Sequence, residues 1–478
     1  MQRKDMTEKI LYGSLWKSIL FVALPLMLNN LIQTLYNLAD ALWVGRLGPE
    51  EFAATSFVWP VLFLFISVGI GVSMAGTSIL SQLIGASKYK DASEFASLIY
   101  RLALGFALLI AALGYFVTPS LIHWMGARGH FARLSADYLQ ILFLGMPFQF
   151  LAFATNAVFQ AQGITMLTTT LSAVSAGLNM VLNPFFIFSR IPGTQIAGLG
   201  WGVAGAAWAT VLAQGVLVVI GFLFVRYKSV HITVQWRRVP WNKERIFLIG
   251  RIGIPSAIGQ SGAAFGFIIL NGIIAAFGTD TLAAFGLVNR VSGIGMLPAM
   301  GIGAALTTVV GQNIGRGQIP RAKDSLRWGF LMTLAVTVTL TIPLYLFDYP
   351  ILNFFMPAER TSPVMVLALH FLLYAVFLNP LMGFFSVLQG FFQGTGHTRY
   401  SMMMEVIRLW GIRLPMIWIL QALHAWTRDG IWYAMIVSNL LVVVLGLWFY
   451  RNGKWKTRVM KEELSDNPVL LEIGKEVE

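Results

Sequence analysis

Long apolar segments follow one another through almost the whole chain of 478 residues. A helix needs about 20 apolar residues to cross a bilayer, and segments of this length predict twelve crossings. Only 12% of the residues are charged, whereas a typical soluble domain has about 25%. The sequence therefore predicts an all-α membrane protein. The expected spans are 15–42, 52–79, 97–118, 138–160, 167–189, 200–225, 247–277, 282–310, 328–347, 366–390, 401–423 and 430–450.

The basic residues gather in alternate loops. The chain has 34 Lys+Arg and 21 Asp+Glu, a net charge of +13, and the excess lies at both ends, in the central linker and in the loops near 88–90 and 316–327. This is the positive-inside pattern of a multi-pass membrane protein, so no nucleic-acid partner is expected. We expect a protein of the cell inner (plasma) membrane with both termini cytoplasmic and an uncleaved first span.

The two halves of the chain resemble each other. One constant shift aligns Pro25 with Pro255 and Gly85 with Gly315, and a slightly larger shift aligns Gly163 with Gly396. Six spans per repeat give both repeats the same orientation, so the pseudo-twofold axis should lie along the membrane normal, with a cavity between two six-helix lobes. The expected division is a cytoplasmic N-terminus 1–11, an N-lobe 12–228, a cytoplasmic linker 229–245, a C-lobe 246–452 and a cytoplasmic tail 453–478.

Asp40 is a carboxylate near the far end of the first apolar span. An ionisable group in hydrocarbon costs several kcal/mol unless it faces protein or water, which makes it a candidate functional residue. At about 100° per residue, polar side chains fall with it on one face of a helix. The alternative is that Asp40 sits at the membrane interface beside Trp43 and Arg46. The polar face consists of Asn29, Gln33, Tyr36, Asn37 and Asp40.

Three more spans of the first half carry polar faces, which favours a hydrated pocket. Interhelical hydrogen bonding, worth about 0.6 kcal/mol on average in membranes, is the alternative for any single side chain. These faces consist of Asn156 and Gln160, of Thr168, Ser172, Ser175, Asn179 and Asn183, and of Thr210 and Gln214.

The second half is chemically different, because the position equivalent to Asp40 is Leu270. Glu405 and Arg408 stand three residues apart at the cytoplasmic start of the eleventh span and should pair locally. Arg413 lies deeper in the same span.

Signatures of metal and nucleotide chemistry are missing. The chain has no cysteine, no H-E-x-x-H and no Walker A sequence, so we expect no metal, no cofactor and no enzyme activity. The glycines of GWGVAG at 200–205 open a span and suit close helix packing. Pro25 in the first span should act as a hinge, because proline removes a helical hydrogen bond.

Several motifs together resemble the multidrug and toxic compound extrusion (MATE) transporters, closest to the DinF-like branch. The resemblance covers about residues 12–452. It rests on LYNLAD at the end of the first span, QLIG and QNIG after spans two and eight, FQ-x-x-G after spans four and ten, NMVLNP at 179–184 and GVAGAAWAT at 202–210.

The resemblance implies cation-coupled export of amphipathic, usually cationic drugs by alternating access, without ATP hydrolysis. The coupling carboxylate of the family falls on Asp40. Its companions fall on Tyr36, Asn179, Asn183, Ala206 through its backbone, and Thr210. The polar faces add Gln33, Asn37 and Asn156 to the expected pocket lining.

One departure from the family pattern bears on the coupling ion. Many relatives have aspartate where this chain has Asn183, which leaves Asp40 as the single carboxylate of the pocket. This favours a proton-coupled antiporter, with organic cations and protons as partners and a monomer in the lipid bilayer. A sodium-coupled antiporter and a lipid-linked-precursor flippase of the same superfamily are the alternatives.

Overall fold

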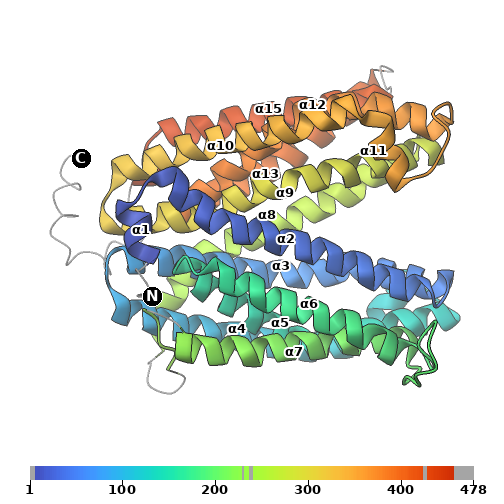
Figure 1. Ribbon diagram of the computed structural model, residues 1–478, viewed down its shortest axis with the longest axis horizontal. Coiled ribbons are helices and arrows are strands. Elements are labelled where there is room, and N and C mark those ends of the chain that lie inside the picture. The colour runs from blue at the N-terminus through green and yellow to red at the C-terminus, as the bar shows by residue number, and fades with distance from the viewer. Residues whose placement is uncertain (1–5, 229–230, 236–240, 424–427, 457–478) are drawn as a thin grey trace. The chain divides into compact units, whose positions relative to one another are not determined.

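The computed structural model describes residues 6–228, 231–235, 241–423 and 428–456 (Figure 1). Apart from one isolated bridge between Arg190 and Ala197, the regular structure of these residues is helical, which confirms the all-α prediction. The helices are α1 Met6–Tyr12, α2 Leu15–Gly45, α3 Pro49–Gly85, α4 Tyr89–Trp124, α5 Gly129–Ala161, α6 Thr165–Ile187, α7 Gly202–Lys228, α8 Lys243–Ala275, α9 Thr279–Arg316, α10 Ile319–Leu346, α11 Asp348–Phe355, α12 Pro363–Gly394, α13 Thr398–Val406, η1 Ile407–Arg413, α14 Leu414–Ala422, α15 Arg428–Arg451 and η2 Lys454–Lys456.

Eleven of the described helices are long and apolar enough to cross a membrane, namely α2 to α10, α12 and α15. The twelfth predicted span, 401–423, coincides with α13, η1 and α14. A seven-residue π-helix, η1, separates two α-helices of nine residues each. This span is therefore present but interrupted, and neither α-helical piece alone is long enough to cross a bilayer.

The chain divides into two compact units. Unit one contains Met1–Met27, Ser81–Ser87 and Ile258–Glu478, and unit two contains Leu28–Leu80 and Lys88–Ala257. Both α2 and α8 are continuous helices that belong to one unit in their first part and to the other in their second part. The change of unit follows Pro25 in α2 and Pro255 in α8 by two residues, where the helical hydrogen-bond ladder is weakest.

Gly85 and Gly315, which are equivalent in the alignment of the repeats, make reciprocal contacts inside unit one. A Cβ on Gly85 would overlap the backbone carbonyl of Gln312, and a Cβ on Gly315 would overlap the carbonyl of Gln82. The QLIG end of α3 and the QNIG end of α9 thus pack backbone against backbone. The reciprocity is what a local twofold relation between the repeats produces.

A second pair of equivalent contacts occurs once in each unit. In unit two, the Cβ position of Gly71 on α3 lies 2.5 Å from the carbonyl oxygen of Gly253 on α8. In unit one, the Cβ position of Gly301 on α9 lies 3.2 Å from the carbonyl oxygen of Ala23 on α2. The start of each repeat's first span therefore packs against the second span of the other repeat.

The turns after α5 and α12 also repeat. Gly163 and Gly396 adopt φ values of 74° and 81°, the left-handed region that favours glycine. Their amides donate to the carbonyls of Gln160 and Gln393 at 2.9 and 3.1 Å. The alignment of Gly163 with Gly396 is thus matched by equivalent backbone hydrogen bonds.

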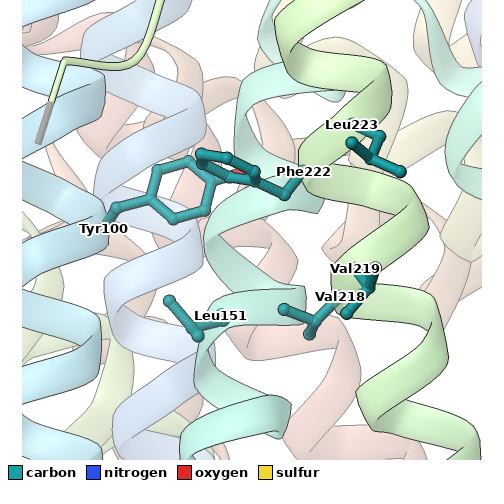
Figure 2. Close-up of a pocket in the computed structure, with 6 residues that line it drawn as sticks. All are labelled: Tyr100, Leu151, Val218, Val219, Phe222 and Leu223. Carbon is teal, nitrogen blue, oxygen red and sulfur yellow. The ribbon is translucent and has the colours of Figure 1, made fainter.

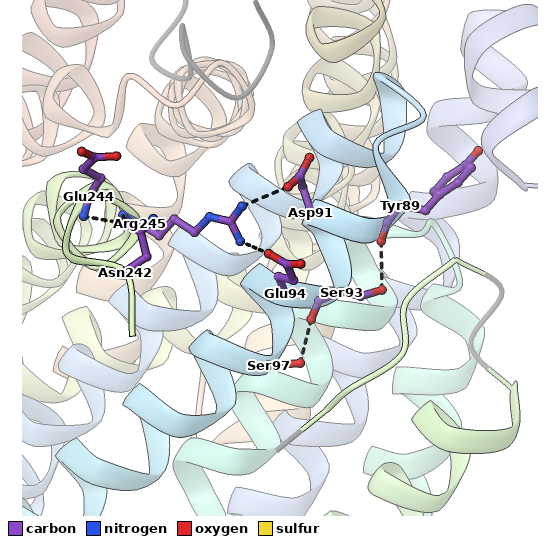
Figure 3. A network of polar contacts seen from close by, with 8 residues as sticks. All are labelled: Tyr89, Asp91, Ser93, Glu94, Ser97, Asn242, Glu244 and Arg245. Atoms are coloured by element: carbon purple, nitrogen blue, oxygen red, sulfur yellow. Dashed lines mark hydrogen bonds and ion pairs between the residues drawn. The ribbon is translucent and has the colours of Figure 1, made fainter. Parts of the chain in front are cut away.

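Part of the linker between the repeats is bound to α4 within unit two (Figure 3). The guanidinium of Arg245 donates to Glu94 at 2.5 Å and to Asp91 at 3.0 Å. Upstream, the amide of Gln235 donates to the hydroxyl of Ser97 at 2.9 Å. These bonds hold the beginning of α8 against α4.

We expect Gly315→Ala to destabilise the protein, because the added methyl must displace the backbone carbonyl of Gln82. Overpacking of this kind costs about 1–3 kcal/mol. Gly272→Ala is the matched control, since no atom lies within 4 Å of its Cβ position in α8 and alanine is the better helix former. Thermal unfolding in detergent should show a lower midpoint for the first variant alone; equal midpoints would contradict the contact.

Candidate functional site

Asp40 belongs to a chain of polar contacts inside unit two. The amide Nδ2 of Asn183 on α6 donates to Asp40 Oδ1 on α2 at 2.8 Å and to Asn179 Oδ1 at 2.9 Å. Both asparagine side chains are buried, with 0% exposure for Asn183 and 1% for Asn179. The carboxylate is therefore held by the amide of Asn183 on a neighbouring membrane helix.

The chain continues to α7. Asn179 Nδ2 donates to the hydroxyl of Thr210 at 3.2 Å, and the hydroxyls of Tyr36 and Thr210 lie 3.2 Å apart. Tyr36 stands one turn before Asp40 on α2, so the sequence of contacts returns to the helix on which it began. Three helices, α2, α6 and α7, thus share one polar network around a single carboxylate.

The network has one unused acceptor. Asn183 Oδ1 is buried and has no hydrogen-bond partner among the described residues. An ionised Asp40 can only accept, whereas a protonated Asp40 can also donate. Once Asp40 is protonated, rotation of the Asn183 amide would bring its oxygen to the new donor. The network therefore has a means of responding to the charge of Asp40.

Tyr138 on α5 was not foreseen from the sequence. It is buried and lies close enough to Asp40 and Tyr36 to interact electrostatically with both. Its face of α5 has Ser135 one turn before it and the apolar Ile141 and Leu142 one turn after it, so no polar periodicity marks it. Only the packing of α5 against the other helices of unit two brings it near the carboxylate.

The other predicted lining residues lie outside the network. Gln33 and Asn37 are exposed, and Gln33 donates to Asn37 at 3.4 Å. Asn156 on α5 has a buried Oδ1 without a described partner. Ala206 is buried on α7 one turn before Thr210. The predicted hinge Pro25 lies in the part of α2 that belongs to unit one.

The residues beyond Asp40 are engaged elsewhere. Trp43 packs edge to face against Phe188, with ring centroids 6.2 Å apart, and the guanidinium of Arg46 lies 5.0 Å from the Trp43 ring. An aromatic belt is typical of the membrane interface. Asp40 lies one turn before Trp43 on α2 and is bound by Asn183, which favours the pocket over the interface interpretation.

The second half of the chain has its own buried ionic group in unit one. Glu405 and Arg408 form a salt bridge, as the sequence predicts. Arg413 is 1% exposed and donates to Ser438 at 3.0 Å and to Asn439 at 2.9 Å on α15.

An apolar pocket of 280 Å³ lies between α4, α5 and α7 (Figure 2). The hydroxyl of Tyr100 is 2.7 Å from that of Thr155 and so has a partner of its own. The pocket has no charged lining residue, so it offers no ion-pair partner for a cation. It is lined by Tyr100, Leu151, Val218, Val219, Phe222 and Leu223.

Comparison with known families gives a match to the MatE family model over residues 25–185 and 255–419. The two matched stretches begin at Pro25 and Pro255, which are equivalent positions of the two repeats. Together they cover more than half of the chain.

The relatives of this chain are membrane transporters. The probable multidrug resistance protein YoeA of Bacillus subtilis is 25% identical over 96% of this chain and 98% of its own. The multidrug export protein MepA of Staphylococcus aureus is 25% identical over 91% and 93%. A solved structure of a MOP superfamily transporter from Pyrococcus furiosus, for which reverse polarity of the binding pocket suggests a different function, is 25% identical and superposes with a TM-score of 0.86 over 96% and 100%.

Thr210 is the branch point of the network, so its removal should matter more than that of Tyr36. Thr210→Val leaves both Asn179 and Tyr36 without their partner, whereas Tyr36→Phe removes one bond. A double-mutant cycle by thermal unfolding should give a coupling energy of about 0.6–1.7 kcal/mol, the range for hydrogen bonds in membranes. Additive effects of the two substitutions would contradict a direct bond.

Proposed function

Because the chain belongs to the MatE family, whose members are transporters and not enzymes, we propose that it exports amphipathic organic cations in exchange for protons. The family and the names of its relatives support drug efflux. The choice of ion rests on the residues of unit two.

The observation that carries the proposal is the position of Asp40. It is the single carboxylate in the hydrogen-bond network of three membrane helices, and its partners are neutral amides and hydroxyls. A low-dielectric site disfavours the charged form of a carboxyl group. Binding of a proton and binding of an organic cation each neutralise the negative charge of Asp40. The two ligands therefore compete for this carboxylate.

Transport then follows from exchange at Asp40. The ionised carboxylate attracts a cationic drug from the cytoplasmic side. Protonation from the outside removes the charge, and the Asn183 amide turns its free oxygen toward the new donor. The drug is released, and α2 bends near Pro25, where it passes from one unit to the other. Loss of the proton to the cytoplasm restores the ionised carboxylate.

Recognition of the drug should be loose. One charge supplies attraction without fixing the shape of the ligand, and aromatic and methionine side chains adapt to different outlines. In this proposal the protein is a monomer in the lipid bilayer of the plasma membrane. The positive-inside bias of the loops supports cytoplasmic termini.

A second carboxylate, which would strengthen a sodium site, does not occur in the network as the structure describes it. No group of three or more His, Cys, Asp and Glu side chains suited to a metal ion occurs in the described part of the chain. At the network itself, Asn183 replaces a second carboxylate with a neutral amide. The proton is the ion that a lone carboxylate can bind by itself.

Replacing Asp40 by Asn should abolish proton-driven export while leaving a folded protein, because the amide keeps the shape but binds no proton. In proteoliposomes with an imposed pH gradient, efflux of a fluorescent organic cation should fall to the protein-free level. The equilibrium affinity of the variant for the organic cation should drop about tenfold or more, which corresponds to the loss of one charge-assisted interaction. Asp137→Asn, at an exposed position of α5, is the matched control. Unchanged proton-driven efflux by the Asp40 variant would assign coupling to another residue.

Asn183→Asp should make the protein sensitive to sodium. Two carboxylates at hydrogen-bond distance repel each other unless a cation lies between them, so sodium should stabilise this variant by mass action. The thermal midpoint would be compared in sodium and potassium chloride at equal ionic strength. The wild type should show no difference between the two salts; a sodium-specific stabilisation of the wild type would favour the sodium-coupled alternative.

A further inference from the structure

Unit one contains a buried ionic cluster at the interruption of the eleventh span. Glu405, at the end of α13, accepts from the guanidinium of Arg408 and from Gln389 Nε2 at 2.8 Å on α12. Arg413, at the end of η1, interacts electrostatically with both charged residues of this pair. Exposures of 7% for Glu405 and 2% for Arg408 show how little of either residue faces solvent.

The cluster carries a net positive charge. It combines two guanidinium groups with one carboxylate, and arginine does not give up its proton in proteins. Both carboxylate oxygens of Glu405 already accept hydrogen bonds, so this acid is satisfied as an ion. The polarity of this site is therefore opposite to that of the Asp40 network.

The fold does not require these charges. Helices α6 and α13 begin at Thr165 and Thr398, which are equivalent in the alignment that pairs Gly163 with Gly396. The same alignment places Ser172 and Ser175 of α6 at the positions of Glu405 and Arg408. A helix in the same place in the repeat thus forms with two serines, and Ser175 donates to the carbonyl of Ala213 at 3.1 Å.

The guanidinium of Arg408 has one N–H group that is available to a ligand. Its Nε is buried and has no hydrogen-bond partner among the described residues. The ring of Phe385 lies 4.8 Å from the guanidinium carbon, and that of Phe267 lies 6.0 Å from it. Phe267 is 42% exposed, whereas Phe385 is buried, so Phe267 is the ring with room to move aside for a ligand. The sulfur of Met382 lies 3.5 Å from Nη1 of Arg408. A π-helical turn at this point is typical of functional positions.

We propose that Arg408, in the cluster that it forms with Glu405, Gln389 and Arg413, binds the anionic group of an amphipathic substrate. Phe267, Phe385 and Met382, which lie against the guanidinium of Arg408, would contact the apolar part of the substrate. This proposal rests on the proposed drug export and adds a substrate class to it. Amphiphiles that carry a carboxylate should be ligands of the protein in addition to simple organic cations. Arg408 is the residue that would pair with the anionic group.

The test uses two probes and two variants. The probes are a rhodamine with a free carboxylate and its methyl ester, which differ only in the anionic group. Glu405→Gln keeps the guanidinium and removes its counter-charge, whereas the double variant Glu405→Gln, Arg408→Gln removes both charges and leaves a neutral pair of similar volume. Binding of each dye to the full chain in nanodiscs would be followed by fluorescence polarisation.

We expect the free carboxylate dye to bind the Glu405→Gln variant at least as tightly as the wild type. The double variant should lose about tenfold or more of that affinity, while the ester should change less than about threefold. If the two variants affect both dyes alike, the cluster serves only to hold the helices and the inference is wrong. If the wild type binds the ester but not the free carboxylate dye, the inference is likewise wrong and drug binding stands. If neither dye binds the wild type, the proposed export of amphiphiles itself is contradicted.

Discussion

The fold depends on the close approach of helix backbones at a few glycines. Gly85 and Gly315 each rest on a glutamine carbonyl of the other repeat, and no residue with a Cβ fits there without moving the backbone. Small residues at helix crossings are the usual means of packing in membranes, where apolar side chains gain little by leaving lipid. At this crossing, close backbone packing rather than the hydrophobic effect therefore determines how the two helices fit together.

The same kind of contact explains why compact units and sequence repeats do not coincide. The beginning of α2 packs against Gly301, and the beginning of α8 packs against Gly71. In each repeat, the start of the first span therefore belongs to the compact unit that contains the second span of the other repeat. As a result, α2 is packed in unit one up to Met27 and carries Asp40 in unit two. A change of charge at Asp40 thus acts on a helix that has residues in both units and contains Pro25 two residues before the end of its unit-one part.

Much of this architecture could be predicted from the sequence, because hydrophobic length and the order of Gly and Pro are local signals. The limits of the spans at α2 and α15 agree with the apolar runs within a few residues. Periodicity also grouped Asp40 with Tyr36 on one helix face. It could not separate Asn37, which is exposed, from Tyr36, which bonds to Thr210, because both lie on the same polar face and the difference is made by the neighbouring helix.

Contacts between helices far apart in sequence were beyond such reasoning. Tyr138 stands in a stretch of mixed polarity, without a polar period, and only the packing of α5 brings it near the carboxylate. The π-helical turn in the eleventh span likewise has no repeating pattern in the sequence that predicts it. The π-helical turn lies between the two α-helical pieces and contains both Arg408 and Arg413, whose guanidinium groups contact different neighbours. One guanidinium is paired with a carboxylate, while the other is bound to two neutral side chains of α15.

Duplication of a fold leaves the copies free to diverge in charge wherever the backbone contacts are kept. Leu270 occupies the place of Asp40 and is fully buried in an apolar cluster, so the carboxylate is not needed to form the helix. Conversely, Glu405 and Arg408 occupy the places of two serines. A charge in the membrane costs free energy in either copy. Each charged group nevertheless occupies a position whose equivalent in the other repeat is a neutral residue. That asymmetry favours a functional origin for both the acidic site and the basic one, because stability alone would have retained the neutral residues.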